Sequence, residues 1–179
     1  MTGPIVTVPD ADDESTLTEA HRLAESLEAD GEDRPDVLAV ALDGIVDPEA
    51  LAAGRPDEIV HVVRDGGTFS TGAAAVTPRA AALAALARDV EPIVVTLPDS
   101  PDTADLAAAT ARRLRGGCVT DCLLRVREGE VRAGRPAYSD RAYAELSFER
   151  GPPVVTLNVD ALGTPESAPS ESIRDRTYE

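Results

Sequence analysis

Four short apolar runs alternate with helical patterns over the first two-thirds of the chain, and this alternation limits the possible folds most. Residues 37–42 contain no polar residue, which indicates a strand buried on both faces, as in parallel sheets covered by helices. The predicted strands are residues 5–8, 37–42, 59–63 and 93–97. Because strands that alternate with helices join through right-handed crossovers, we predict an α/β fold, a Rossmann-like three-layer parallel sheet flanked by helices.

Helical patterns with clear start and stop signals fill the intervals between these strands. The first opens at Thr16, which predicts a capping box with Glu19, and it runs to about Ala29 before Asp30-Gly31 ends it. Its expected buried stripe is Leu17, Ala20, Leu23, Ala24 and Leu27. Three further helices are predicted at residues 48–54, at residues 77–88 and after Ser100-Pro101, the last with a buried stripe of Leu106, Ala109, Thr110 and Leu114.

The last third of the chain changes to a strand-rich pattern. Residues 119–127 and 131–136 flank Glu128-Gly129-Glu130, which predicts a C-terminal β-hairpin extension of the sheet. A mostly polar, half-exposed strand or pair of short segments is expected over residues 138–148. Residues 153–159 are typical of a final apolar strand.

From Gly163 onward the sequence is rich in Pro, Ser and Glu and has no apolar face. Such a composition is typical of a segment without a packed core. We therefore predict one α/β domain over residues 1–162 and a flexible acidic tail over residues 163–179.

The charge balance is strongly acidic. The chain has 17 basic residues, all of them Arg, against 33 Asp and Glu, and its net charge is −16. This charge repels phosphate backbones, so we exclude DNA or RNA binding through a basic surface. A dense acidic surface without Lys resembles the proteins of halophiles and favours a halophilic archaeal source. The alternative is an acidic face that meets a specific partner.

The sequence offers no signal for a membrane or for export. No apolar run approaches the roughly 18 residues of a membrane span, and the N-terminus lacks a charged-then-apolar signal peptide. We expect a cytoplasmic location and no membrane span.

Residues able to carry chemistry are few and scattered. His21 and His61 are the only histidines, and neither has a second His or a Cys at metal-ligand spacing. Cys118 and Cys122 have a spacing that matches no standard zinc or redox motif, which favours two small buried side chains. Walker A, dinucleotide-binding and nucleophile-elbow motifs are absent. We therefore predict no catalytic residue and no metal ligand.

Loops after the strands are the remaining candidate sites, because open α/β sheets bind ligands beyond the carboxyl ends of their strands. They are residues 9–15, 43–48, 65–78 and 98–102. The third is long and contains Gly66-Gly67 and Gly72, so it is either a site or a surface loop. Most of these loops are acidic rather than Gly-rich, which argues against a nucleotide. The cofactor-binding residues, if there are any, stay unknown from the sequence.

Several motifs in the second half of the chain carry a family resemblance. They are Asp105-Leu106-Ala107, Ala111-Arg112-Arg113-Leu114, Arg135-Pro136-Ala137-Tyr138 and the strand 153–159. With Val119-Thr120-Asp121 between them, residues 91–162 resemble the N-terminal domain of the electron transfer flavoprotein alpha subunit, within the adenine nucleotide alpha hydrolase-like superfamily. The chain departs from the family pattern at Thr103-Ala104, where the family has Gly-Arg, and at Asn158, where it has Arg.

The resemblance implies a scaffold or interaction subunit of a flavin-dependent electron transfer system, such as that of fatty acid oxidation, rather than an enzyme. In the family, FAD sits on a second domain and AMP on the beta subunit. We therefore expect no cofactor on this chain alone, FAD on a partner domain or separate polypeptide, and AMP on a beta-like partner, in a heterodimer.

Two other readings stay open. The same general sheet occurs in universal-stress-type modules that bind AMP or ATP, although the Gly-rich pattern expected after the fourth strand is missing here. The hairpin region 123–148 is also a candidate interface for a homodimer, unless it only extends the edge of the sheet.

Overall fold

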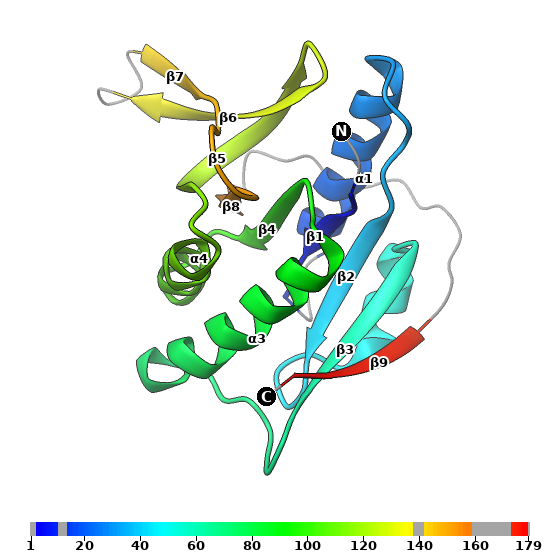
Figure 1. Cartoon of the computed structure of the whole chain (residues 1–179), viewed down its shortest axis with the longest axis vertical. Helices are drawn as coiled ribbons and strands as arrows, with labels where there is room; N and C mark the ends of the chain where they lie inside the picture. The colour runs from blue at the N-terminus through cyan, green and yellow to red at the C-terminus, as the bar shows by residue number, and fades with distance from the viewer. Residues whose placement is uncertain (1–2, 11–13, 138–141, 159–172, 179) are drawn as a thin grey trace.

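The computed structural model describes residues 3–10, 14–137, 142–158 and 173–178, and its helices and strands alternate through the first two-thirds of the chain (Figure 1). The helices are α1 (Ser15–Ala29), α2 (Pro48–Leu51), α3 (Val76–Val90) and α4 (Pro101–Leu114), with the short 3₁₀ turns η1 (Ala52–Gly54) and η2 (Ala73–Ala75). The strands are β1 (Ile5–Thr7), β2 (Val37–Leu42), β3 (Glu58–Arg64), β4 (Val94–Pro98), β5 (Cys118–Arg127), β6 (Glu130–Ala137), β7 (Ala142–Leu146), β8 (Val154–Leu157) and β9 (Ile173–Tyr178).

The strands form one sheet in the order β7-β6-β5-β8-β4-β1-β2-β3-β9. Every neighbouring pair from β5 to β9 is parallel, whereas β6 pairs antiparallel with both β5 and β7. The predicted α/β class is confirmed, and so is the hairpin that extends the parallel sheet. The neighbouring strands β1 and β4 lie where the strand order reverses, the place at which ligands bind in many open sheets.

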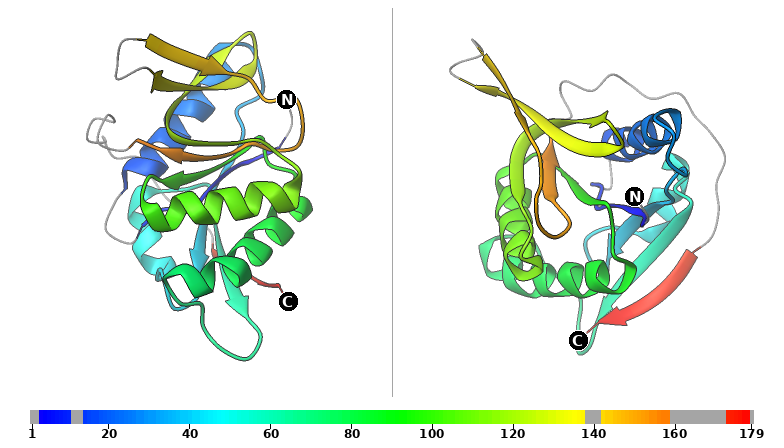
Figure 2. Two further views of the ribbon diagram at one scale, coloured as in Figure 1. Left: turned by 90° about the vertical axis from the view of Figure 1, so that its left-hand side faces the viewer. Right: turned by 45° about the horizontal axis from the view of Figure 1, so that its top comes forward.

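Helices cover both faces of this sheet, and this explains the apolar run of β2. All six residues of β2 are buried. Its odd-numbered residues join the core cluster that contains the buried side of α1, and its even-numbered residues join the cluster that contains α3 and α4. Figure 2 shows α3 and α4 together on one side of the sheet and α1 on the other. In the part of the chain that the structure describes, no helix is long and apolar enough to span a membrane.

Helix α1 follows the predicted length and buried stripe, but its predicted capping box is wrong. The helix begins at Ser15, and its N-cap, Glu14, makes no side-chain cap hydrogen bond. Thr16 and Glu19 are buried inside the helix instead. Glu19 accepts hydrogen bonds from Arg22, 2.6 Å from its Nε, so tertiary packing uses the carboxylate that the sequence pattern assigns to the cap.

Helix α4 starts as predicted. Ser100 is the N-cap, its Oγ accepts a hydrogen bond from the Thr103 backbone N–H, and Pro101 occupies the first turn. The buried stripe is shifted relative to the prediction: Ala107 and Ala111 are buried, whereas Ala109 and Leu114 are only half-buried. The difference arises because α4 packs against α3 as well as against the sheet, so the buried stripe of α4 is wider on the side that faces α3.

The hairpin turn is tighter than predicted. Arg127 pairs with Glu130, so the loop has two residues, Glu128 and Gly129, both with positive φ (55° and 73°). That geometry is a type I′ turn, whose twist matches that of the flanking strands. In the half-exposed region after the hairpin, residues 142–146 form β7, and residues 138–141 lie outside the described residues.

The end of the chain corrects one expectation. Residues 163–172 and 179 of the predicted tail lie outside the described residues, but Ile173–Tyr178 form β9, which pairs parallel with β3 at the far edge of the sheet. The physical reason is that an edge strand needs only main-chain partners and no apolar face. The domain boundary at residue 162 otherwise stays a prediction.

Candidate functional site at the carboxyl edge of the sheet

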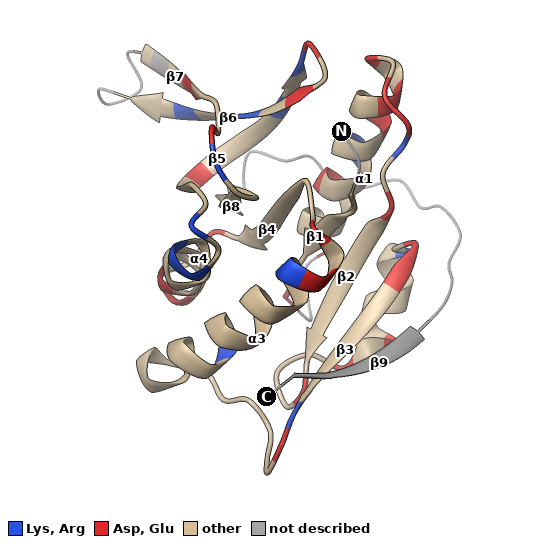
Figure 3. Cartoon of the chain, viewed as in Figure 1, with Lys and Arg blue, Asp and Glu red and all other residues tan. Residues whose placement is uncertain are grey.

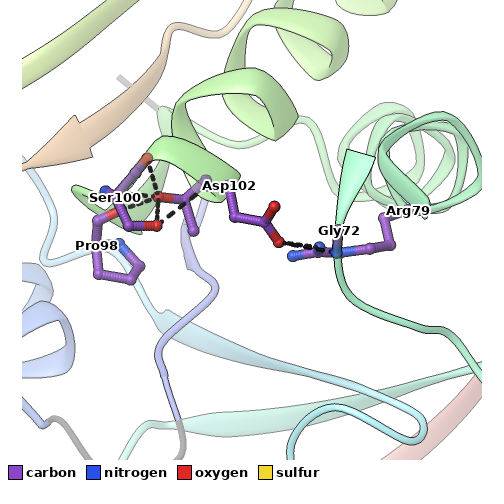
Figure 4. Close-up of polar contacts among 6 residues, drawn as sticks. Gly72, Arg79, Pro98, Ser100 and Asp102 are labelled. Atoms are coloured by element: carbon purple, nitrogen blue, oxygen red, sulfur yellow. Dashed lines mark hydrogen bonds and ion pairs between the residues drawn. The ribbon is translucent and has the colours of Figure 1, made fainter. Parts of the chain in front are cut away.

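The N-terminus of α4 lies just beyond the carboxyl end of β4, and local polar groups close it. Thr103 Oγ1 donates to the Pro98 carbonyl at 2.5 Å and lies 2.8 Å from Ser100 Oγ (Figure 4). The Ser100 backbone N–H in turn donates to Thr103 Oγ1 at 2.9 Å. These contacts satisfy the polar groups of the β4–α4 turn from within the turn itself.

Asp102, in the first turn of α4, ties this helix to the loop that precedes α3. Its Oδ2 accepts from the backbone N–H of Gly72 at 3.2 Å and from Arg79 Nη1 at 3.3 Å (Figure 4). The Arg79 side chain is only 6% exposed, whereas that of Asp102 is 44% exposed. Asp102 is therefore the anion that balances a buried guanidinium, and it fixes the end of the long Gly-containing loop.

A second polar cluster joins the carboxyl ends of β4 and β8 to an irregular segment early in β5. Asp99 Oδ1 accepts hydrogen bonds from Thr156 Oγ1 and from the backbone N–H of Asp121, the latter at 3.1 Å. Asn158 Nδ2 donates to Asp121 Oδ1 at 2.7 Å. Asp121 has a φ of 54° at an irregularity where β5 shifts its register against β8. The cluster holds this irregular segment against the ends of β8 and β4.

Two carboxylates lie at this edge of the sheet. Helix N-termini commonly bind anions through backbone N–H groups and the helix dipole. Here the carboxylates of Asp99 and Asp102 lie at that end of α4. Asp102 accepts hydrogen bonds from Gly72 and Arg79, and Asp99 accepts hydrogen bonds from Thr156 and Asp121. Among residues 3–10, 14–137, 142–158 and 173–178, no group of three or more His, Cys, Asp or Glu side chains is arranged to hold a metal ion.

The two histidines lie apart, in keeping with structural roles. His21 Nε2, on α1, lies 3.2 Å from the Gly54 carbonyl. His61 Nε2, on β3, lies 3.7 Å from Asp43 Oδ1 at the end of β2. Each ring therefore connects neighbouring elements of the fold.

The two cysteines are both free thiols. Cys122 is buried beside the Thr156 carbonyl, which lies 3.5 Å from its Sγ, and burial raises the pKa of this thiol to about 12, although the charge of Arg135 acts in the opposite direction. The prediction that both cysteines are buried is wrong for Cys118, which is exposed because it begins β5, although partial burial raises the pKa of its thiol as well. Since the thiolate is the reactive form, Cys122 is unsuited to nucleophilic or redox chemistry near neutral pH.

Three of the four predicted candidate loops come together through hydrogen bonds. The Phe69 N–H donates to the Asp43 carbonyl at 2.8 Å, and Gly72 meets Asp102 as described above. Gly44 permits the first contact, because a Cβ there would lie 2.5 Å from Thr68 Cβ. Of the loop 9–15, residues 11–13 lie outside the described residues.

Sequence reasoning missed the residues that tie these loops to the helices and strands, namely Arg79, Asp121, Thr156 and Asn158. Arg79 sits in an Ala-rich helical pattern, where a lone Arg suggests a solvated position, and only its burial identifies it as a partner of Asp102. Asn158 is the only Asn of the chain and departs from the family pattern, and these two facts were the available signals for it.

Comparison with known proteins adds one finding. The family model described as the electron transfer flavoprotein domain matches residues 7–175, which spans the fold from β1 into β9. A search of curated proteins returned no match.

Proposed function

The chain belongs to the electron transfer flavoprotein domain family, and from that membership we propose that it acts as the alpha-type scaffold subunit of a flavin-dependent electron transfer system. In this proposal the chain packs against a beta-type subunit, FAD is held by a partner domain or polypeptide, and AMP is held by the beta-type partner. The chain itself catalyses no reaction. The family match over residues 7–175 is the observation that carries the proposal.

The closed carboxyl edge of the sheet supports a scaffold role. A related sheet would hold a phosphate at the position that Asp99 and Asp102 occupy. In this chain the two carboxylates instead fix two loops and an irregular strand. A rigid edge of this kind suits a subunit that presents a surface rather than one that admits a cofactor.

Two of the departures from the family motifs also support a scaffold role, because each has a structural use in this chain. Thr103 replaces the family's Gly and completes the capping box of α4. Asn158 replaces the family's Arg and holds Asp121 at 2.7 Å. Both positions are therefore committed to the fold. A cytoplasmic location, a halophilic source and a link to fatty acid oxidation stay predictions.

Reconstitution with a partner tests the proposal. The chain would be purified alone, and also after co-expression with a beta-type subunit and a flavin-domain polypeptide of the family, in buffers containing molar KCl. We expect a stable complex with stoichiometric flavin absorbance that a partner dehydrogenase can reduce, and substoichiometric flavin on the chain alone. Stoichiometric FAD on the isolated chain would refute the scaffold role, and failure to form any complex would refute the subunit role.

Calorimetric titration of the isolated chain with AMP and ATP addresses the nucleotide-binding alternative. We expect no heat of binding at sub-millimolar concentrations, since two carboxylates flank the α4 N-terminus. Saturable sub-millimolar binding would favour a universal-stress-type module instead.

A further inference from the structure

The last turns of α3 and α4 meet at the amino edge of the sheet and enclose a small pocket there. Its volume is about 290 Å³, and the segment that leads into β8 forms its other wall. The lining residues are four apolar ones and two charged ones, namely Ala87, Pro92, Leu114 and Pro152 with Arg88 and Glu91. Small-molecule sites usually have about 300–1,000 Å³, so this pocket suits a single side chain better than a cofactor.

Contacts within the fold hold the walls of this pocket in place. Arg88 Nη2, on α3, donates to the Arg113 carbonyl at 2.7 Å, which joins the last turns of the two helices. On the other wall, Gly151 lies against the end of α4, where a Cβ on it would be 3.1 Å from both the Leu114 carbonyl oxygen and Gly116 Cα. Gly151 also has a φ of 61°. The pocket is therefore part of the folded structure rather than a gap beside a loose segment.

Basic residues surround the pocket, and with it they form what we call the amino-edge surface: Arg88, Arg112, Arg113, Arg115 and Arg150. Arg115 and Arg150 come together because each directly neighbours one of the two contacting glycines. Both side chains are exposed, and in the part of the chain that the structure describes neither makes an ion pair or a side-chain hydrogen bond. The other three also have no acidic partner there, and two of them donate to main-chain carbonyls instead.

The charge of the amino-edge surface is opposite to that of the chain as a whole. Its five arginines face three neighbouring acids, Asp89, Glu91 and Glu149, whereas the chain has 33 acidic and 17 basic residues. Elsewhere in the described ranges, arginines such as Arg34 and Arg127 lie 3.0 and 3.1 Å from a carboxylate. Figure 3 shows basic positions at the ends of α3 and α4 beside β4 and on the segment that leads into β8, with acidic positions between them. The surface is thus a local excess of positive charge on an acidic molecule.

The chemistry of this surface favours a polypeptide that carries carboxylates. Both helices end here, so they present carbonyl groups rather than N–H groups to an anion, and the guanidinium groups must bind it. Guanidinium groups pair with carboxylates through two parallel hydrogen bonds. The apolar pocket beside them suits an apolar anchor side chain, which a polypeptide provides and a phosphate headgroup does not.

We propose that the amino-edge surface is a docking site for an acidic segment of a partner protein. One apolar side chain of that segment enters the pocket, and the carboxylates on either side of it pair with Arg115 and Arg150. The inference goes beyond the proposed electron transfer role and does not depend on it, because it rests on the pocket and on the unpaired arginines alone.

Peptide binding to the intact chain, followed by NMR, tests the docking site. The probe is a capped synthetic peptide in which one Leu is flanked by Glu residues, in the lowest KCl concentration that keeps the spectrum of the folded protein. We expect saturable binding, with shifts at the Arg88, Arg115 and Gly116 amides and none at Gly72. No binding at millimolar peptide, or shifts centred elsewhere, would overturn the proposal.

Two altered peptides separate the roles of charge and anchor. Arg in place of every Glu should abolish binding, and Gly in place of the Leu should weaken it by about tenfold or more, because the pocket then loses its apolar occupant. Binding that is unchanged by the loss of the Leu would refute the use of the pocket. Equal binding of the acidic and basic peptides would refute the acidic preference.

Charge reversal on the protein side locates the contact. R115E/R150E should weaken binding of the acidic peptide by about tenfold or more, because each exposed pair changes from attraction to repulsion. R55E/R64E is the matched control, since it makes the same change of charge before and at the end of β3, on the other side of the sheet. Equal effects of the two double variants would show a dependence on net charge only and refute the site.

Sedimentation with phosphatidylglycerol vesicles tests the competing anionic occupant, a lipid surface. We expect the chain to stay in the supernatant, because its net charge of −16 opposes approach to an anionic membrane. Co-sedimentation that is lost in R115E/R150E would refute the protein partner and assign the amino-edge surface to lipid headgroups instead.

Discussion

Removal of the Asp102 carboxylate should destabilise the protein by about 2 kcal/mol, because it leaves the Arg79 guanidinium buried without its anion. A fully buried pair broken in this way costs roughly 3–5 kcal/mol. Two observations reduce that figure: Asp102 is 44% exposed, and its two hydrogen bonds are long, at 3.2 and 3.3 Å. For a chain of this size, 2 kcal/mol corresponds to a fall in Tm of roughly 4–8 °C.

Two further variants isolate the cause. D102A/R79M should recover most of the lost stability, because a buried apolar side chain of similar length needs no counter-ion. D105A removes an exposed carboxylate from the same helix and should change the stability by less than about 0.5 kcal/mol.

Urea denaturation at constant molar KCl measures the free energies of unfolding for this series, and amide exchange at Gly72 reports on the loop. Exchange at Gly72 should accelerate in D102A, since the carboxylate that accepts its N–H is gone. If D102A matched D105A, or if R79M failed to rescue D102A, the buried-charge reasoning would be refuted.

Four more predictions concern the hairpin turn, the two thiols and the core. In the same urea assay, E128N should stabilise the protein by about 0.5–1 kcal/mol and G129A should destabilise it by about 1 kcal/mol. The reason is that both positions have positive φ and that Asn-Gly is the favoured pair in a type I′ turn. Stability changes of the same sign in the two variants would contradict the assigned turn. A thiol-specific dye should label Cys118 in the native protein and Cys122 only on unfolding. The pKa of Cys122 is raised to about 12 in the fold, so the unfolded chain loses this proton at a lower pH than the folded one. The free energy of unfolding should therefore fall as the pH rises from about 9 towards 12. The control variant C122A should lose less stability over this pH range. L23A should lower the free energy of unfolding by about 2.7–5 kcal/mol, since Leu23 is fully buried between α1 and the sheet. E25A, on the exposed side of α1, should lower it by less than about 0.5 kcal/mol. Equal losses of stability would show that α1 does not pack as described.

The elements that local patterns define were predictable from the sequence. The run 37–42 specifies a strand buried on both faces, and Ser100-Pro101 specifies a helix start, because each depends only on neighbouring residues. The two-residue turn at Glu128-Gly129 was located to within one residue for the same reason.

Features that depend on distant partners were not predictable. Thr16 and Glu19 fit a capping box by spacing, yet burial and Arg22 decide the role of Glu19. The insertion of β8 between β4 and β5, and with it the junction of Asp99, Asp121 and Asn158, follows from strand order, which no local signal encodes.

The position of β9 has a consequence for synthesis of the chain. β9 pairs with β3, yet about 110 residues separate the two strands in the sequence. At translation rates of about 5–20 residues per second, the ribosome needs roughly 6–22 s to make that stretch. During this time the nascent sheet presents the edge of β3 without its final partner, next to other growing chains on the same message. The molecule is therefore most exposed to edge-to-edge association before its synthesis ends, and a co-translational chaperone would protect it at that stage more than at any later one.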